Sequence, residues 1–490
     1  MIRVEYHGPA SFKAPFWYVL RQLSRMTGLV FANGAGGDRD GVRAELFYGK
    51  MPDSSGKRRL CIGAVPEYLP DNANVRRAVA DGSAPQNLPR RILYLFTGDM
   101  PSFEEILYLD ADRQPLVSHS EQTVSCTCDL IATCFYMLNL EQENRTATRD
   151  EHGRFQREFT RESSLYDMPV VDRIVRLIEI LLVAPKVPGI VPYPAIWPDH
   201  KPFAVALSHD VDRIRTWTLR KARRAIAPVL KSRGLSAVLP AAGYLLRSMA
   251  RPENWAGNFK TITRMESQYG AASTFFFVQQ RRSSIDPGYS LTSGRLQRGI
   301  SALDKAGAAI GLHGTSGAYR NAEKLQHEKS GLERVIGKTV NGCRQHYLTF
   351  DSGMTWRILQ DAGFSYDSTV GFSNAPGYRC GTGFPYHPWD PDTQQEMSLI
   401  EIPLVLMDTV LFLESKQGLS AANSHQVVFD LLEETRINRA CLTVNWHNSD
   451  LFADDWSGFS ELYSTILEWT AEHNGWLCTL DELHDWWRQL

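Results

Sequence analysis

Polar residues that could do chemistry lie just past several short apolar runs of this chain. They are Asp210 with Asp212, His313, Arg344 with His346, Tyr366 with Asp367, and Asn445 with His447. Strands of a parallel α/β fold end at one edge, so these side chains are expected to share a site. A carboxylate and two imidazoles suit Zn²⁺ with a position left for water, while a second carboxylate and another histidine can move protons. The pattern predicts metal-assisted hydrolysis.

The segment 203–213, FAVALSHDVDR, is the clearest of these patterns. Its apolar run stops abruptly at a polar cluster, which is typical of a buried parallel strand that delivers side chains to a site. Side chains alternate along a strand, so Asp210 and Asp212 point to one face and His209 to the other. Two carboxylates on one face repel each other unless a cation or a proton lies between them. We therefore expect a cation or a proton here.

The surrounding elements alternate between strands and helices. Strands are expected at 272–278, 309–312, 340–343, 400–404 and 441–446, and helices at 260–269, 296–306, 322–336, 354–362 and 459–473. Strand followed by helix at this spacing predicts an α/β fold, either a parallel barrel or a doubly wound sheet.

The first 195 residues carry mixed helix and strand signals. They contain a strand candidate at 91–96, a buried helix at 129–140, a charged turn at 149–155 and a helix at 170–183. A metal site at Glu151 and His152 is excluded, because adjacent residues do not share a face. We therefore interpret the turn as a solvated loop. Five prolines between 185 and 198 then indicate an extended linker. A chain of 490 residues should form two or three domains, and we divide it into 1–195 and 200–490.

Composition excludes several classes of protein. With 43% hydrophobic and 22% charged residues and a formal charge of −2, the chain has no global basic field, so nucleic acid is not an expected partner. Its first twenty residues carry charges and a proline where a signal peptide needs an apolar core, and no run of about twenty apolar residues appears. A cytoplasmic protein is expected. Its eight cysteines include no zinc-knuckle spacing and are interpreted as buried free thiols.

One segment, 213–252, has ten basic residues, no acidic residue and interleaved apolar side chains. Such a segment could lie on the inner face of an anionic membrane as a peripheral contact, or hold an acidic glycan. The alternative is a pair of surface helices with a solvated basic face.

The polar strand ends resemble the motifs of a known family. SHDVD, STFFF, IGLHGTSGAY, GCRQHY and VNWHN, in this order, resemble the polysaccharide deacetylase family of carbohydrate esterases over residues 202–490. The resemblance implies a distorted (β/α)7 barrel, preceded by a smaller α+β domain. Residues 1–195 resemble an uncharacterised amino-terminal domain that accompanies a subgroup associated with surface polysaccharide synthesis.

The resemblance also implies roles for individual residues. Asp210 would be the general base, Arg344 the group that orients it and His447 the general acid, while a backbone N–H near Tyr347 would stabilise the oxyanion. Asp212 and His313 would bind a divalent metal, most simply Zn²⁺. The family's second histidine would fall at position 317, which is glycine. We favour His346 as the third ligand, over a role for it in substrate contact or hydrogen bonding, with His387 and Asp351 as further candidates.

Substrate contacts are expected from two further places. The aromatic and glycine-rich stretch 366–390 could form a sugar platform in which Arg379 binds an acidic or phosphorylated group, or it could be an ordered covering loop. Trp446, beside His447, could form the floor of an acetyl-sized pocket or belong to the core.

The implied activity is removal of an N-acetyl rather than an O-acetyl group from an amino sugar of a surface polysaccharide or of its lipid-linked precursor. Two alternatives stay open. One is a glycoside hydrolase that uses a carboxylate pair without metal. The other is a catalytically inactive barrel that binds carbohydrate, which the missing histidine at position 317 makes reasonable.

Overall fold

The computed structural model describes residues 2–33, 44–49, 59–62, 117–119, 123–126, 129–160, 163–183, 196–214, 255–411, 421–448 and 459–490. The expected strand at 91–96 and most of the expected linker and basic segment lie outside these residues. Within the described residues, no helix is long and apolar enough to cross a membrane. Six cysteines of this part are buried and free, as expected: Cys126, Cys134, Cys343, Cys380, Cys441 and Cys478.

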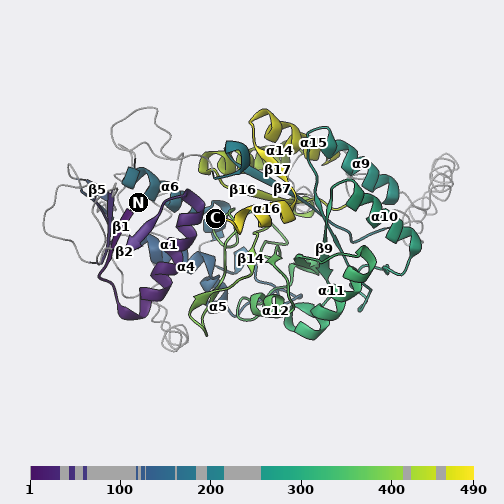
Figure 1. The fold of residues 1–490 in the computed structure, drawn as a ribbon, viewed down its shortest axis with the longest axis horizontal. Coiled ribbons are helices and arrows are strands. Elements are labelled where there is room, and N and C mark those ends of the chain that lie inside the picture. Colours follow the sequence, from purple (N-terminus) through teal and green to yellow (C-terminus); the bar gives the residue numbers. More distant parts are fainter. Residues whose placement is uncertain are drawn as a thin grey trace, which may run out of the picture.

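The amino-terminal region is built on a sheet of the order β2-β1-β3-β4-β6-β5. Its strands are β1 (Ile2–Tyr6), β2 (Phe31–Asn33), β3 (Ala44–Tyr48), β4 (Arg59–Ile62), β5 (Val117–His119) and β6 (Thr123–Cys126). All described pairs are parallel except β5 with β6. Three helices pack together with this sheet: α1 (Lys13–Thr27), α4 (Leu130–Leu138) and α6 (Val170–Val183) (Figure 1).

The helices α4 and α6 lie where the sequence predicts them. Asp129 caps α4 by accepting the N–H of Ala132 at 2.8 Å, and its other carboxylate oxygen accepts the hydroxyl of Tyr48 at 2.5 Å. The predicted helix therefore begins at a residue that also ties it to the sheet.

The carboxyl-terminal part is the (β/α) barrel that the sequence predicts. Its parallel strands follow the order β14-β11-β10-β9-β8-β7-β16-β15, and β17 pairs with the first half of β7. They are β7 (Ala204–Asp210), β8 (Thr274–Phe277), β9 (Ala309–Gly314), β10 (Gly342–Gln345), β11 (Tyr366–Asp367), β14 (Ile400–Glu401), β15 (Leu406–Met407), β16 (Cys441–Asn445) and β17 (Trp476–Cys478).

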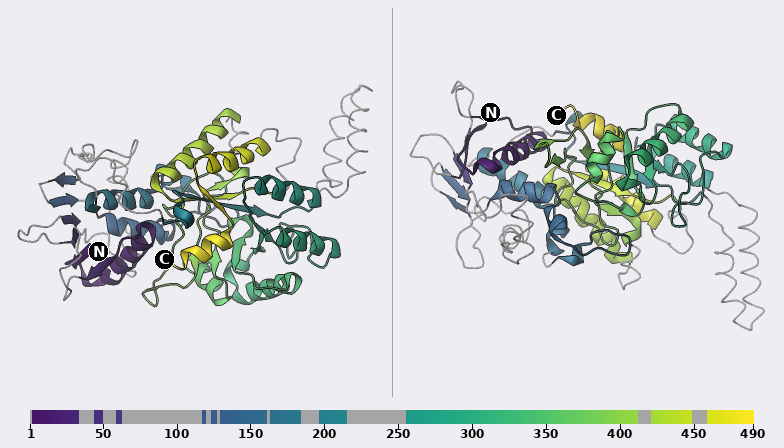
Figure 2. Two further views of the ribbon diagram at one scale, coloured as in Figure 1. Left: turned by 45° about the horizontal axis from the view of Figure 1, so that its top comes forward. Right: turned by 90° about the horizontal axis from the view of Figure 1, so that it is seen from below.

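Helices surround the curled sheet on its outer side, as the views in Figures 1 and 2 show. They are α9 (Trp255–Ser267), α10 (Gly294–Lys305), α11 (Ala322–Ile336), α12 (Thr355–Asp361), α14 (Ala421–Asn438), α15 (Phe459–Glu472) and α16 (Leu480–Trp487). A short antiparallel pair, β12 (Trp389–Asp390) with β13 (Gln395–Glu396), lies between β11 and β14 in the chain.

The strand β7 is central to the barrel. It pairs with β16 along one edge and with β17 and β8 along the other, and all seven of its residues are buried. A strand buried on both faces reads as a continuous apolar run, which explains residues 203–207. Its last residues, Ser208 to Asp210, extend into the region where β8 and β9 also end.

The amino-terminal region packs directly against the barrel. Glu143 of α5 (Glu141–Arg145) receives two hydrogen bonds of 2.7 Å from the guanidinium of Arg379. The N–H of Tyr378 donates to the carbonyl of Tyr166 at 2.8 Å, and that carbonyl would lie only 2.4 Å from a Cβ at Gly377. Of the two expectations for the stretch 366–390, the covering loop therefore fits.

Candidate functional site

The polar ends of neighbouring strands converge inside the barrel. Asp210 ends β7, His313 lies in β9, and Arg344 lies in β10 directly opposite His313. His209 points the other way, as predicted, and its Nε2 lies 3.0 Å from a carboxylate oxygen of Glu266 on α9. The alternation along β7 thus separates a structural histidine from the carboxylates of the site.

Three residues form a group that could hold a metal ion: Asp212, His313 and His346, with one donor atom of each within 4.8 Å of the others. Asp212 Oδ1 lies 3.4 Å from Nε2 of His313 and 3.7 Å from Nε2 of His346. This oxygen is buried and accepts no hydrogen bond. Burial tends to raise the pKa of Asp212, but the neighbouring imidazoles hold it well below its usual range. A buried anionic oxygen that faces two imidazole nitrogens is a donor set that fits a divalent cation such as Zn²⁺.

The far side of each imidazole faces an oxygen atom, which for His313 lies within hydrogen-bond distance. Nδ1 of His313 lies 2.9 Å from the carbonyl oxygen of Arg344, and Nδ1 of His346 lies 3.6 Å from Asp286 Oδ1. Asp286 in turn accepts the N–H groups of Ser316 at 2.8 Å and Ser283 at 2.7 Å. The hydrogen bond on Nδ1 orients the ring of His313 and leaves Nε2 as its ligand atom. Nδ1 of His346 is buried and faces the charge of Asp286 without a hydrogen bond, while its Nε2 faces Asp212.

Asp210 is fixed beside this group without belonging to it. Its Oδ1 accepts a hydrogen bond of 3.0 Å from Arg344, and its Oδ2 accepts one of 2.9 Å from the side chain of Asn445. Oδ2 also lies 4.0 Å from Nε2 of His313. Burial favours the neutral acid, but the charges of Arg344 and His313 outweigh it and lower the pKa of Asp210. A carboxylate that is ionised and oriented in this way can accept a proton.

Arg344 has the geometry that an orienting residue needs. Its side chain is fully buried and donates to the hydroxyl groups of Ser208 and Ser368, each at 2.8 Å. The guanidinium carbon lies 4.6 Å from the ring centroid of Phe276. These contacts hold the guanidinium of Arg344 in place beside the carboxylate of Asp210.

His447 also lies beside Asp212. Its Nδ1 is 2.7 Å from Asp408 Oδ1, and its backbone N–H donates to Asp408 Oδ2 at 2.8 Å. Its Nε2 is 3.6 Å from Asp212 Oδ2. Asp408 therefore sets the ring so that Nε2 faces the metal-binding group, where a general acid would be needed.

Tyr347 follows the strand β10 in a single 3-10 turn, His346–Leu348. The strand ends at Gln345, so His346 reaches the site through this turn and not through strand alternation. The ring of Tyr347 lies 4.4 Å from that of His346 and is partly exposed. Trp446, in contrast, is fully buried, with its ring 5.4 Å from that of Tyr463, so the core alternative fits.

The expected substrate contact of Arg379 is corrected by the structure. Its side chain is 1% exposed and forms its ion pair with Glu143 of the amino-terminal region. The guanidinium of Arg379 already donates to both carboxylate oxygens of Glu143 inside the protein, so it cannot bind an acidic sugar. Its role is to join the two regions.

The two further candidates for the third ligand do not reach the metal-binding group. His387 packs against α1, where its carbonyl accepts the hydroxyl of Tyr18 at 2.8 Å and its Nδ1 faces the carbonyl of Met397 at 2.9 Å. Asp351 begins the turn into α12 and pairs with Arg320 at 2.9 Å. Gly317 has a φ of 78°, a left-handed conformation that a histidine would adopt only with strain.

Sequence reasoning missed Asp286 and Asp408 as residues of the site. Asp408 directly follows the strand β15, whose two residues are too few to give a periodic signal. Asp286 lies in the long connection between β8 and α10, where no local pattern marks a carboxylate as a partner of His346.

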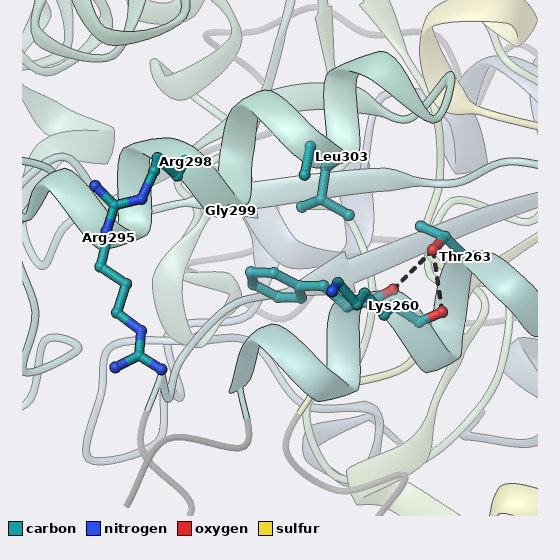
Figure 3. A pocket seen from close by; sticks show the side chains of 8 residues that line it. Lys260, Thr263, Arg295, Arg298, Gly299 and Leu303 are labelled. Atoms are coloured by element: carbon teal, nitrogen blue, oxygen red, sulfur yellow. Dashed lines mark hydrogen bonds between the residues drawn. The ribbon is translucent and has the colours of Figure 1, made fainter.

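A cavity of about 260 Å³ lies away from these residues, between helices α9 and α10 (Figure 3). Its lining includes Phe259, Lys260, Arg295, Arg298 and Leu303. None of the strand-end residues takes part in it, so the metal-binding group and not this cavity is the candidate site.

Comparisons with known proteins match two kinds of relative. A family of unknown function, DUF7033, matches residues 82–184. No curated protein matches the chain. Solved structures that are similar include a polysaccharide deacetylase described as putative from Mycobacterium smegmatis, at 19% identity and a TM-score of 0.40, covering 60% of this chain and 93% of that one.

Two further structures are similar at lower identity. A probable polysaccharide deacetylase from Pseudomonas aeruginosa has 13% identity and a TM-score of 0.41, covering 61% of this chain and 96% of its own. A pseudoenzyme of carbohydrate esterase family four from Bacillus anthracis has 11% identity and a TM-score of 0.30, covering 58% and 65%. Similarity at this level says nothing about chemistry, so the chemistry of the site must follow from its own residues.

Proposed function

We propose that the protein is a metal-dependent hydrolase that removes an N-acetyl group from an amino sugar of a polysaccharide or of its precursor. One observation carries this proposal: Asp212, His313 and His346 form a group that could hold a metal ion, and both Asp210 and His447 lie beside it. An ionised carboxylate and a separately held imidazole, both beside a cation site, are the groups that acyl hydrolysis requires.

The proposed role of each residue follows from its contacts. A bound divalent cation would supply a Lewis acid that activates water and polarises the acetyl carbonyl. Asp210, held by Arg344 and Asn445, would accept the proton of the attacking water. His447, held by Asp408, would donate a proton from Nε2 to the leaving nitrogen. The backbone N–H of Tyr347 would donate to the oxyanion.

The substrate class is supported by the motif resemblance over residues 202–490. We propose a surface glycan or its lipid-linked precursor, met by a cytoplasmic protein at the inner face of the membrane. The basic segment 213–252 would supply the contact to anionic headgroups. Zn²⁺ is the cation that best fits one carboxylate and two imidazoles.

The test is acetate release from N-acetylated oligosaccharides by the purified full-length protein, before and after chelation and re-addition of zinc. Expected results are chelator-sensitive acetate release, loss of one acetyl mass from the sugar, and no new reducing ends. Asp210→Asn should abolish release, whereas Asp392→Asn, at an exposed carboxylate paired with Arg357, should not.

Two outcomes would favour the alternatives instead. Chelator-resistant release of reducing ends would indicate a glycoside hydrolase. Glycan binding without turnover, unchanged by Asp210→Asn, would indicate an inactive binding barrel.

A further inference from the structure

The charged turn of the amino-terminal region, which the sequence indicated as a solvated loop, lies against the candidate site. Arg154 donates a hydrogen bond of 2.9 Å to the backbone carbonyl of Tyr347, and its guanidinium carbon lies 5.9 Å from the centroid of the Tyr347 ring. The ring of His152 lies 4.7 Å from the same ring. A segment about two hundred residues away in the chain therefore contacts the residue next to His346.

This turn is held rigidly before it meets Tyr347. Asp150 accepts hydrogen bonds from the N–H groups of His152 and Arg154, both at 2.9 Å, and from Nε of Arg154 at 2.7 Å. Gly153 takes a φ of 77°, and its N–H donates to the carbonyl of Asp150 at 2.9 Å. Burial would raise the pKa of Asp150, but these bonds keep it below its ordinary value. The guanidinium is thus presented in a preformed position.

The backbone that Arg154 contacts is strained. Tyr347 and Leu348 have φ values of 62° and 54°, a left-handed conformation that costs free energy for residues with a side chain. Such a conformation persists only where the surroundings hold it. The side chain of Leu348 is buried in a small apolar cluster with Leu404, Met407 and Val410. The carbonyl of Tyr347 is held from the other side by Arg154.

The contacts continue from this turn to the metal-binding group. The ring of His152 lies on Tyr347, the ring of Tyr347 lies 4.4 Å from His346, and the ring of His346 lies 5.1 Å from His313. A displacement of the Tyr347 backbone would therefore move both the proposed oxyanion donor and an imidazole of the candidate metal group.

We infer that the amino-terminal region completes the active site, with Arg154 as a positioning residue for the Tyr347 peptide and for His346. This rests on the proposed function for its kinetic consequence, but its structural consequence is independent of any activity. It gives the amino-terminal region a role that neither its composition nor its family match assigns.

The kinetic test compares Arg154→Ala, Arg154→Lys and Arg25→Ala in the zinc-loaded full-length protein. Arg25 is the matched control, because it joins the same two regions through hydrogen bonds of 3.1 Å to both carboxylate oxygens of Glu396, remote from Tyr347. The probe is 4-nitrophenyl acetate, which carries the acetyl group and no sugar. Loss of a partner that orients the site should lower kcat about tenfold or more in Arg154→Ala with KM little changed. Arg154→Lys should recover part of this loss, and Arg25→Ala should resemble wild type.

A crystal structure of metal-free Arg154→Ala supplies the readout that needs no activity. Displacement of the turn His346–Leu348, or a change of the Tyr347 φ to negative values, is expected. An unchanged turn, or kinetics identical to Arg25→Ala, would overturn the inference. If wild type releases no acetyl group from any substrate, the proposed function fails while the crystal structure still decides the positioning role.

Discussion

Asp408 holds His447 through both of its carboxylate oxygens, one on the imidazole Nδ1 at 2.7 Å and one on the backbone N–H at 2.8 Å. The two contacts together fix both the side chain and the backbone of His447. A carboxylate on Nδ1 determines the tautomer and stabilises the protonated ring, so that the proton available for transfer is on Nε2.

Asp408→Asn should therefore lower kcat of the proposed deacetylation by about a hundredfold or more, the range typical of a positioned proton donor. The amide keeps the shape but has one acceptor oxygen, so it can accept from only one of the two N–H groups and turns its own N–H donors towards the other. Steady-state kinetics with an N-acetylated oligosaccharide would measure the effect. Asp392→Asn is the control at an exposed carboxylate. A variant with wild-type kcat would remove Asp408 from the mechanism.

Metal content should separate the histidines of the site from the others. Single changes of Asp212, His313 or His346 to alanine should each weaken zinc binding strongly, because each removes one of three donors. His387→Ala should keep full occupancy, since His387 packs against α1. Elemental analysis after dialysis at matched free zinc would decide this. Full occupancy in His346→Ala would contradict the assignment of the third ligand.

Arg344 and Asp210 should be strongly coupled in stability. Arg344→Met leaves the buried carboxylate of Asp210 without its main countercharge and should lower the free energy of unfolding by about 3 kcal/mol or more. In an Asp210→Asn background the same change should cost much less, because no buried charge is left unpaired. Urea unfolding of the four proteins forms the cycle. Equal costs in both backgrounds would show that Arg344 acts through Ser208 and Ser368 instead.

A buried pair of acids should make stability depend on pH. Asp367 and Glu401 are paired residues of β11 and β14 and are fully buried. Burial raises the pKa of Asp367 to about 6, and burial together with the charge of Asp367 raises that of Glu401 well above its usual range. The folded state therefore keeps a proton that the unfolded chain releases near pH 4.5.

The direction in which stability changes with pH follows from this retained proton. Stability is greatest below the unfolded pKa of Glu401 and falls as pH rises, by up to about 1.4 kcal/mol per pH unit for one proton. Glu401→Gln has no carboxyl proton to lose, so it should flatten this dependence. Its single acceptor oxygen cannot serve both Trp356 Nε1–H and the N–H of Val370, so it should also lower stability at low pH. Urea unfolding between pH 5 and 9 is the measurement. Parallel pH curves for the two proteins would mean that the pair shares no proton.

The sequence by itself determined several central strands of the barrel and the residues at their ends. Asp210, His313 and Arg344 lie where apolar runs stop, and a parallel sheet brings such ends together whatever else the chain does. The helices α4, α6 and α11 were likewise predicted within one or two residues, because periodicity and capping are local properties.

Only the tertiary structure decided which distant residues complete the site. Asp286 and Asp408 lie outside long periodic elements, and no spacing along the chain relates them to His346 or His447. Arg379 and Arg154 both lie in polar or aromatic stretches of the sequence. In the fold, Arg379 is buried against Glu143, whereas Arg154 contacts Tyr347. Periodicity reports which face of an element is buried, but not which partner covers it, because the partner is set by the packing of the whole chain.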